Sequence, residues 1–219
     1  MIDSIIDKLI FFIPVLTSAI AFMIFNNTHK MYIISKYEGL KIFSLAFLLF
    51  GIENFSRFFL YYMIPKLSIL SSNLYNTIKL VSYISLISSL LYLSYSLTWK
   101  NFSTKKKDVS FKIILLFIVS ILVAIIGLFN SFILYFIAFC IFSYTLFLLY
   151  NKYIMLKLQK NERKYIKLYF FVLVLTFLSY ISNIVFRFIP YLRWYVNSVI
   201  FFVFIILYAG TVKTTFKNS

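Results

Sequence analysis

Seven runs of about twenty mainly apolar residues limit the fold of this chain more than any other feature. They lie at Leu9 to Phe25, Leu40 to Ile64, Leu80 to Trp99, Phe111 to Phe129, Ser131 to Tyr150, Leu168 to Ile189 and Trp194 to Val212. A helix of about twenty residues crosses a hydrocarbon core of about 30 Å. Backbone groups in lipid must also be hydrogen-bonded within the chain, which favours helices. We therefore expect an all-α polytopic membrane protein in which residues 1–219 form one domain of seven transmembrane helices.

Composition and charge agree with a membrane location. Hydrophobic residues make up 63% of the chain and the mean hydropathy is +0.94, whereas the apolar share of soluble domains is about half. A formal net charge of +16 would suit nucleic-acid binding in a soluble protein. Here the lysines and arginines lie mostly in short loops between apolar runs, which is the pattern of cytoplasmic loops in membrane proteins. We expect these loops to contact anionic lipid headgroups, and we expect no nucleic-acid partner.

The basic residues also predict the orientation in the membrane. The loops after the first, third and fifth runs, with the C-terminal tail, hold sixteen of them, and the other side holds six. This asymmetry predicts an outside N-terminus and a cytoplasmic C-terminus, with the cell membrane as the location. The assignment depends on a turn at Phe129-Asn130-Ser131, because without it the fourth and fifth runs would be one broken element.

Polar residues interrupt the second run, which is otherwise apolar. Glu53 and Arg57 lie four residues apart, so on a helix they share one face and form a neutralised pair. Asn54 is the neighbour of Glu53. A charge at the bilayer centre costs a few kcal/mol, and such residues usually face a partner or a polar cavity. The pair is therefore a candidate functional site.

The sixth run carries a second polar face, formed by Ser179, Asn183 and Arg187 at intervals of four residues. We expect the two faces to meet, so that Glu53 bridges both guanidinium groups and leaves a place for a carboxylate or phosphate. The predicted ligand-binding residues are Glu53, Asn54, Arg57, Asn183 and Arg187. The alternative is that the arginines extend to the outer headgroups and the Glu53 pair only fastens the bundle.

Two weaker patterns bear on the arrangement of the helices. Aligning Arg57 with Arg187 also aligns Phe58 with Phe188, which suggests a parallel 3+1+3 repeat of two three-helix units. In the third run, mostly small hydroxyl residues recur every three or four positions: Ser82, Ser85, Ser89, Tyr92 and Ser96. Such a seam favours close helix packing, with a hydrophilic conduit as the alternative. We therefore expect the third helix in the bundle interior.

Residues for catalysis are few. His29 is the sole histidine and Cys140 the sole cysteine, so a His-rich metal centre and a CxxC site are excluded within this chain. Asp108 and Glu162 are isolated acidic residues among lysines, and no glycine-rich phosphate loop occurs. We expect no cofactor and no metal, and an enzymatic function is the least supported hypothesis.

The seven runs, the outside N-terminus and the 3+1+3 pattern together resemble SWEET-type sugar transporters and microbial rhodopsins. The resemblance is one of topology over the whole chain. The Pro-Gln dipeptide of the SWEET and PQ-loop families is absent, and the last run holds no lysine that could bind retinal, since Lys213 lies beyond its end. No functional residue is therefore carried over from either family.

Two functions follow as hypotheses. The first is binding or transport of a small polar or anionic solute through the cluster between the second and sixth helices. The alternative is a non-enzymatic membrane sensor, anchor or accessory subunit, with a membrane-protein partner or a second copy of the chain. A polar cavity open to the outside would favour the first function, and a large apolar lateral face would favour the second.

Overall fold

The computed structural model describes residues 2–60, 72–102 and 106–157, and the residue pairs 198–199, 201–202, 205–206 and 208–209. Within these ranges the chain is helical and contains no β-strand. The helices are α1 (Ile2–Ser35), α2 (Glu38–Phe58), α4 (Ser72–Phe102), α5 (Lys106–Phe129) and α6 (Ser131–Lys157). The first, third, fourth and fifth apolar runs lie wholly within one helix each, and the second lies in α2 as far as Phe58. The prediction of an all-α fold is confirmed for the described residues.

The remaining two runs fall outside the described residues, wholly for Leu168 to Ile189 and largely for Trp194 to Val212. The count of seven helices and the 3+1+3 repeat therefore stay predictions. In the described part, four helical segments are long and apolar enough to cross a membrane: Glu38–Phe58, Ser72–Trp99, Asp108–Phe129 and Ser131–Asn151. These segments support an integral membrane protein.

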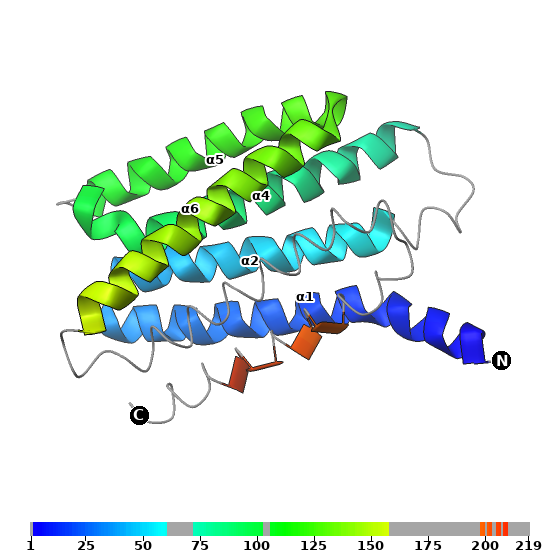
Figure 1. Cartoon of the computed structure of the whole chain (residues 1–219), viewed down its shortest axis with the longest axis horizontal. Coiled ribbons are helices and arrows are strands. Elements are labelled where there is room, and N and C mark those ends of the chain that lie inside the picture. The colour runs from blue at the N-terminus through cyan, green and yellow to red at the C-terminus, as the bar shows by residue number, and fades with distance from the viewer. Residues whose placement is uncertain are drawn as a thin grey trace.

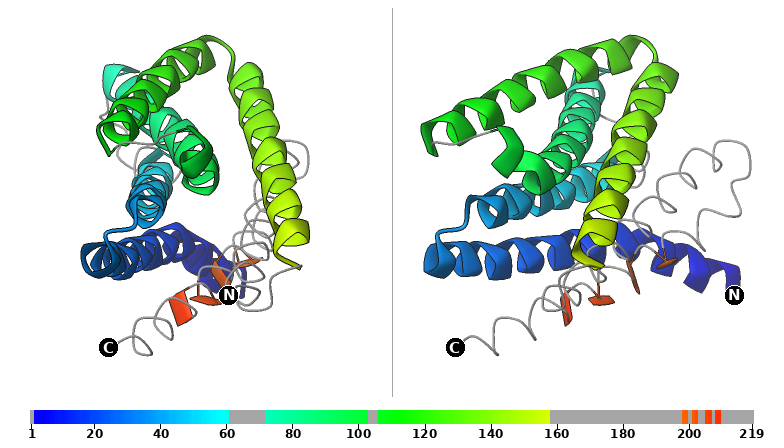
Figure 2. Two further views of the ribbon diagram at one scale, coloured as in Figure 1. Left: turned by 90° about the vertical axis from the view of Figure 1, so that its left-hand side faces the viewer. Right: turned by 60° about the vertical axis from the view of Figure 1, so that its left-hand side comes forward.

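Successive helices run in opposite directions (Figure 1). Helices α1, α2 and α4 lie side by side in one row, with α5 beyond α4, and α6 crosses alongside this row in contact with α4 and α5 (Figure 2). Three described helices contact α4, namely α2, α5 and α6. Of its candidate span, 67% is buried, compared with 17% of the α5 span. The predicted interior position of the third apolar run is therefore confirmed.

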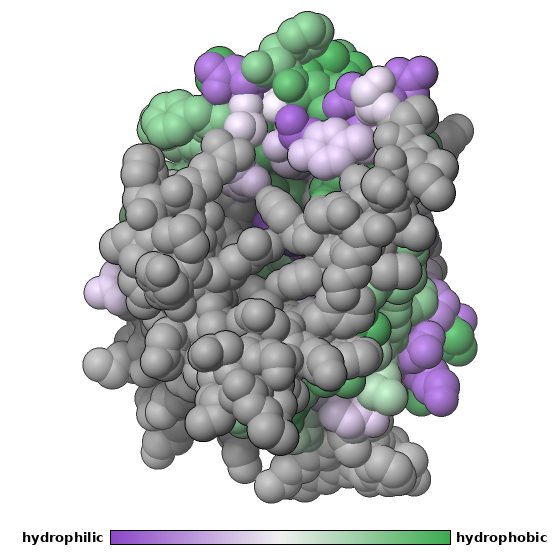
Figure 3. Space-filling model, turned by 90° about the vertical axis from the view of Figure 1, so that its right-hand side faces the viewer, coloured by the Kyte–Doolittle hydropathy of each residue, from purple (hydrophilic) through white to green (hydrophobic). Residues whose placement is uncertain are grey.

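The two ends of the bundle differ in the connections they carry. The turn from α1 to α2, the C-terminal ends of α4 and α6 and the start of α5 lie at one end, and the α5–α6 turn lies at the other (Figure 1). Cytoplasmic loops are predicted after α1, α4 and α6, so the first end is the one predicted to be cytoplasmic. Figure 3 views the opposite end, where hydrophobic and hydrophilic residues lie next to each other among the described atoms.

Asn130 makes the turn between α5 and α6. Its backbone N–H donates to the Ile126 carbonyl oxygen at 3.0 Å, which ends α5. Its side-chain Oδ1 accepts from the Phe132 backbone N–H at 3.0 Å, which caps the start of α6. The sequence prediction of two separate helices at this point is confirmed.

We expect Asn130→Ala to lower the free energy of unfolding by about 1 kcal/mol, because the cap of α6 is lost. Equilibrium unfolding in mixed detergent micelles would measure the change. Asn76→Ala is the matched control, since Asn76 is an exposed asparagine inside α4 and its loss should change stability by less than about 0.5 kcal/mol. Equal effects of the two substitutions would show that Asn130 does not act as a cap.

Candidate binding site on α2

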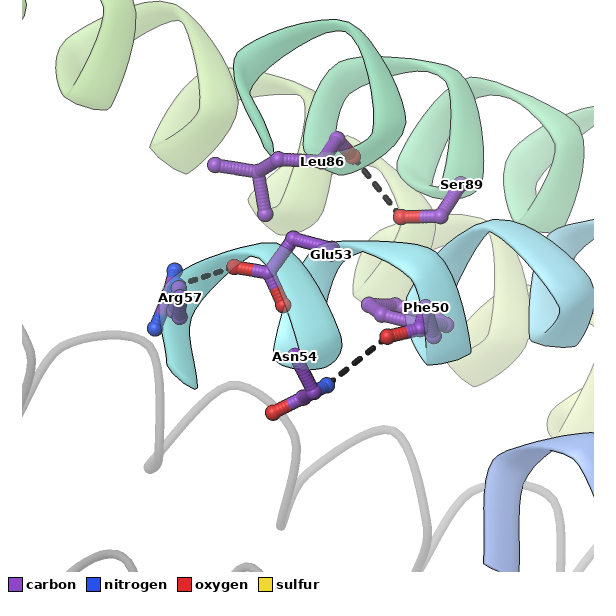
Figure 4. Close-up of polar contacts among 6 residues, drawn as sticks. All are labelled: Phe50, Glu53, Asn54, Arg57, Leu86 and Ser89. Carbon is purple, nitrogen blue, oxygen red and sulfur yellow. Dashed lines mark hydrogen bonds and ion pairs between the residues drawn. The ribbon is translucent and has the colours of Figure 1, made fainter. Parts of the chain in front are cut away.

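The candidate site lies in the last two turns of α2. The Arg57 Nε lies in ion-pair contact with Glu53 Oε1, as the spacing of four residues predicts (Figure 4). Glu53 is 3% exposed, and the side chain of Arg57 is 19% exposed. The carboxylate is therefore shielded from solvent almost completely, and the guanidinium only in part.

Asn54 belongs to the same turn but has a different partner. Its Nδ2 donates to the Phe50 carbonyl oxygen at 2.8 Å, within α2 itself. Figure 4 shows the amide on the side of α2 away from α4. Asn54 is half-buried, so its side-chain oxygen could still accept a hydrogen bond from a ligand on that side.

Helix α4 forms the wall opposite Glu53. Leu86 and Ser89 of α4 lie across from the carboxyl group (Figure 4), and the Ser89 hydroxyl donates to the Leu86 carbonyl oxygen at 2.7 Å. Because that donor is already used within α4, Ser89 offers only acceptor lone pairs to its surroundings. The predicted hydroxyl seam is largely buried: Ser82, Ser85, Ser89 and Tyr92 are each less than 7% exposed, and Ser96 is half-buried.

Helix α1 packs closely against α2 just before the ion pair. The Ser18 hydroxyl donates to the Gly51 carbonyl oxygen at 2.8 Å. A Cβ atom added to Gly51 would lie 2.6 Å from Cε1 of Phe22, so a larger residue would require the Phe22 ring to shift. This contact lies two residues before Glu53 in α2.

Some polar contacts of the bundle were not found by sequence reasoning. Ser94 and Thr145 join α4 to α6 by a short hydroxyl–hydroxyl hydrogen bond. Ser88 is fully buried, and its hydroxyl has no hydrogen-bond partner among the described residues. The sequence contained one sign of the contact between Ser18 and Gly51. Gly51 is one of only four glycines, and it stands two residues before Glu53.

Other ionisable residues lie far from this site along α2. Glu38 begins α2 and is buried, and it accepts a hydrogen bond of 3.5 Å from the Tyr32 hydroxyl. Burial and the Glu38 carboxylate raise the pKa of the Tyr32 phenol. In the described part of the chain, no three His, Cys, Asp or Glu side chains are grouped as metal ligands.

Two of the five predicted ligand-binding residues, Asn183 and Arg187, lie outside the described residues, as does Ser179. The contact between the second and sixth runs therefore stays a prediction. No protein-family model, no curated protein and no solved structure matches this chain. The functional interpretation accordingly rests on the residues and their geometry.

Proposed function

We propose that this chain is an integral membrane protein that binds or transports a small polar or anionic solute at the polar cluster of α2. The observation that supports the proposal is the buried ion pair of Glu53 and Arg57 inside a candidate membrane span. Ionised residues are rare in such segments and commonly mark a solute or ion pathway. Asn54, and by the sequence prediction Asn183 and Arg187, complete the proposed site.

The chemistry of the pair suits an anion. A guanidinium group offers several N–H donors in one plane and binds carboxylate or phosphate oxygens through two parallel hydrogen bonds. In the structure, Glu53 occupies the place of such an anion next to Arg57. The partial exposure of Arg57 gives a solute a point of access that the buried carboxylate lacks.

The proposal is tested by thermal unfolding of the detergent-purified protein in chloride alone and with added acetate or inorganic phosphate. An anion at about 100 times its Kd stabilises the folded protein by about 2.7 kcal/mol, which raises the Tm by about 5 to 10 °C. We expect this rise in the wild type with at least one of the two added anions. We expect none in the double variant Glu53→Gln/Arg57→Gln, which lacks both charges and should still fold.

A second function, a membrane sensor, anchor or accessory subunit, is favoured by the outer face of α5. Phe111, Ile118 and Leu122 are each more than half exposed, and only 17% of the α5 span is buried. Lipid or a second membrane protein would cover this face. Absence of any anion effect on Tm, together with loss of folding when the ion pair is broken, would favour this second function.

A further inference from the structure

The ion pair contains one carboxylate and one guanidinium. Both belong to α2, and in the described part of the chain Arg57 is the basic side chain in ion-pair contact with Glu53. The pair is therefore neutral as a unit. An anion that binds the guanidinium must compete with Glu53 for it, because the carboxylate is already in ion-pair contact with the Arg57 Nε.

We propose that binding of one monovalent anion at Arg57 places one proton on the Glu53 carboxyl group, so that solute and proton bind together. This inference rests on the proposed function and specifies its coupling. The balance is simple: the Glu53 carboxylate and a proton from solvent form the neutral carboxylic acid, and the anion becomes the counter-ion of Arg57. The net charge of the Glu53–Arg57 pair with its bound proton and anion is zero before and after binding. Arg187, which the sequence predicts in the same site, lies outside the described residues and is not counted in this balance.

Burial is the reason for the coupling. Glu53 is 3% exposed, so water cannot solvate its carboxylate once Arg57 turns to another anion. A buried unpaired charge costs several kcal/mol, and breaking a buried pair by removal of one partner costs about 3–5 kcal/mol. A carboxyl group in this situation becomes neutral by taking a proton.

Among the described residues, Arg57 is the charged side chain in ion-pair contact with Glu53. Opposite this part of α2, α4 presents Leu86 and Ser89, and α1 presents Ser18. None of these three side chains can replace Arg57 as a counter-ion. Of the charged and histidine residues on α1, α4 and α5, Asp3, Asp7, Lys8 and Lys79 belong to the turns at the same end of the bundle as the pair, and the others belong to the opposite end: His29, Lys30, Lys100, Lys106, Lys107, Asp108 and Lys112.

The coupling has a direct consequence for transport. If the loaded site is exposed in turn to each side of the membrane, one anion and one proton cross together and no net charge moves. The class of transport is then electroneutral proton–anion symport. An inward proton gradient would accumulate the solute.

The test measures the Kd for acetate between pH 6.5 and 8.5, by titration calorimetry of the detergent-purified full chain. Acetate stays ionised in this range, because carboxyl groups lose their proton at a pH of about 4. Uptake of one proton with the anion predicts a tenfold rise in Kd per pH unit. In Glu53→Gln, the neutral amide stands in for the protonated acid, so the Kd should not change with pH and should be more than 100-fold lower than that of the wild type at pH 8.5.

Glu38→Gln is the matched control, since Glu38 is a second buried glutamate at the other end of α2 and its loss should leave the tenfold slope intact. Acetate binding with a pH-independent Kd in the wild type overturns the inference but leaves the proposed function standing. That result would fit a second positive charge at the site, as the sequence predicts for Arg187. Absence of acetate binding at every pH overturns both the inference and a carboxylate-binding function.

Discussion

Arg57→Gln is expected to lower the free energy of unfolding by about 3 kcal/mol at pH 7.5, because it leaves the buried Glu53 carboxylate without its partner. The loss should depend on pH. A lone buried carboxyl is stable only as the neutral acid, so the variant loses up to about 1.4 kcal/mol of stability for each pH unit of increase, whereas the wild type does not. Equilibrium unfolding in mixed micelles at pH 5.5, 6.5 and 7.5 measures both effects.

The double variant Glu53→Gln/Arg57→Gln is the control for this prediction. Two neutral amides can face each other with no unpaired charge, so its stability should lie within about 1 kcal/mol of the wild type and should not vary with pH. If Arg57→Gln is as stable as the double variant at every pH, Glu53 is not held as a buried ion by Arg57. The structural basis of the proposed site would then be lost.

Gly127→Ala is expected to lower the free energy of unfolding by about 2 kcal/mol, because α5 and α6 are in contact at this residue. A Cβ atom at Gly127 would lie only 2.8 Å from the Leu134 Cβ, with the Leu134 Cγ at 3.1 Å. Leu134 is completely buried, so its side chain has no free space into which it could move. The helices would therefore have to separate near their turn.

A second substitution tests whether the contact with Leu134 causes this loss of stability. Leu134→Ala removes the Cγ and Cδ atoms that the new methyl group would meet and keeps only the Cβ. Gly127→Ala/Leu134→Ala should therefore be more stable than the sum of the single effects indicates, by about 0.5 kcal/mol or more. Ile125→Leu, at a lipid-facing position that is 42% exposed, should be nearly neutral. Strictly additive effects of the two substitutions would contradict the contact at Gly127.

The sequence predicted the positions of the described helices well but their ends poorly. Hydropathy marks the part of a helix that lies in lipid, and it contains no information on where the helix stops in water. Helix α1 thus continues from Phe25 through Asn26, Asn27 and Thr28 to Ser35, where Lys36 adopts a positive φ of 53° and ends it. Helix α4 similarly begins eight residues before the predicted Leu80, in exposed polar turns.

The site was predictable only where its contacts are local. A spacing of four residues brings Glu53 and Arg57 together on any helix, so the sequence was sufficient for that pair. The contact of Ser18 with Gly51 depends on the offset between α1 and α2 along their axes. The periodicity of one helix contains no information on that offset. The predicted roles of Asn183 and Arg187 depend on the same kind of long-range packing and stay predictions.

Many hydroxyl groups of the bundle donate to carbonyl oxygens of their own helix, three or four residues earlier. Thr28, Ser44, Ser89, Ser96 and Ser120 all do so. Each helix can therefore enter the lipid one at a time during synthesis with most of its polar hydrogen atoms already bonded, before any neighbour is present. The Glu53–Arg57 pair follows the same rule, because α2 carries the carboxylate and the guanidinium on adjacent turns. The helix can therefore enter the membrane without a net buried charge.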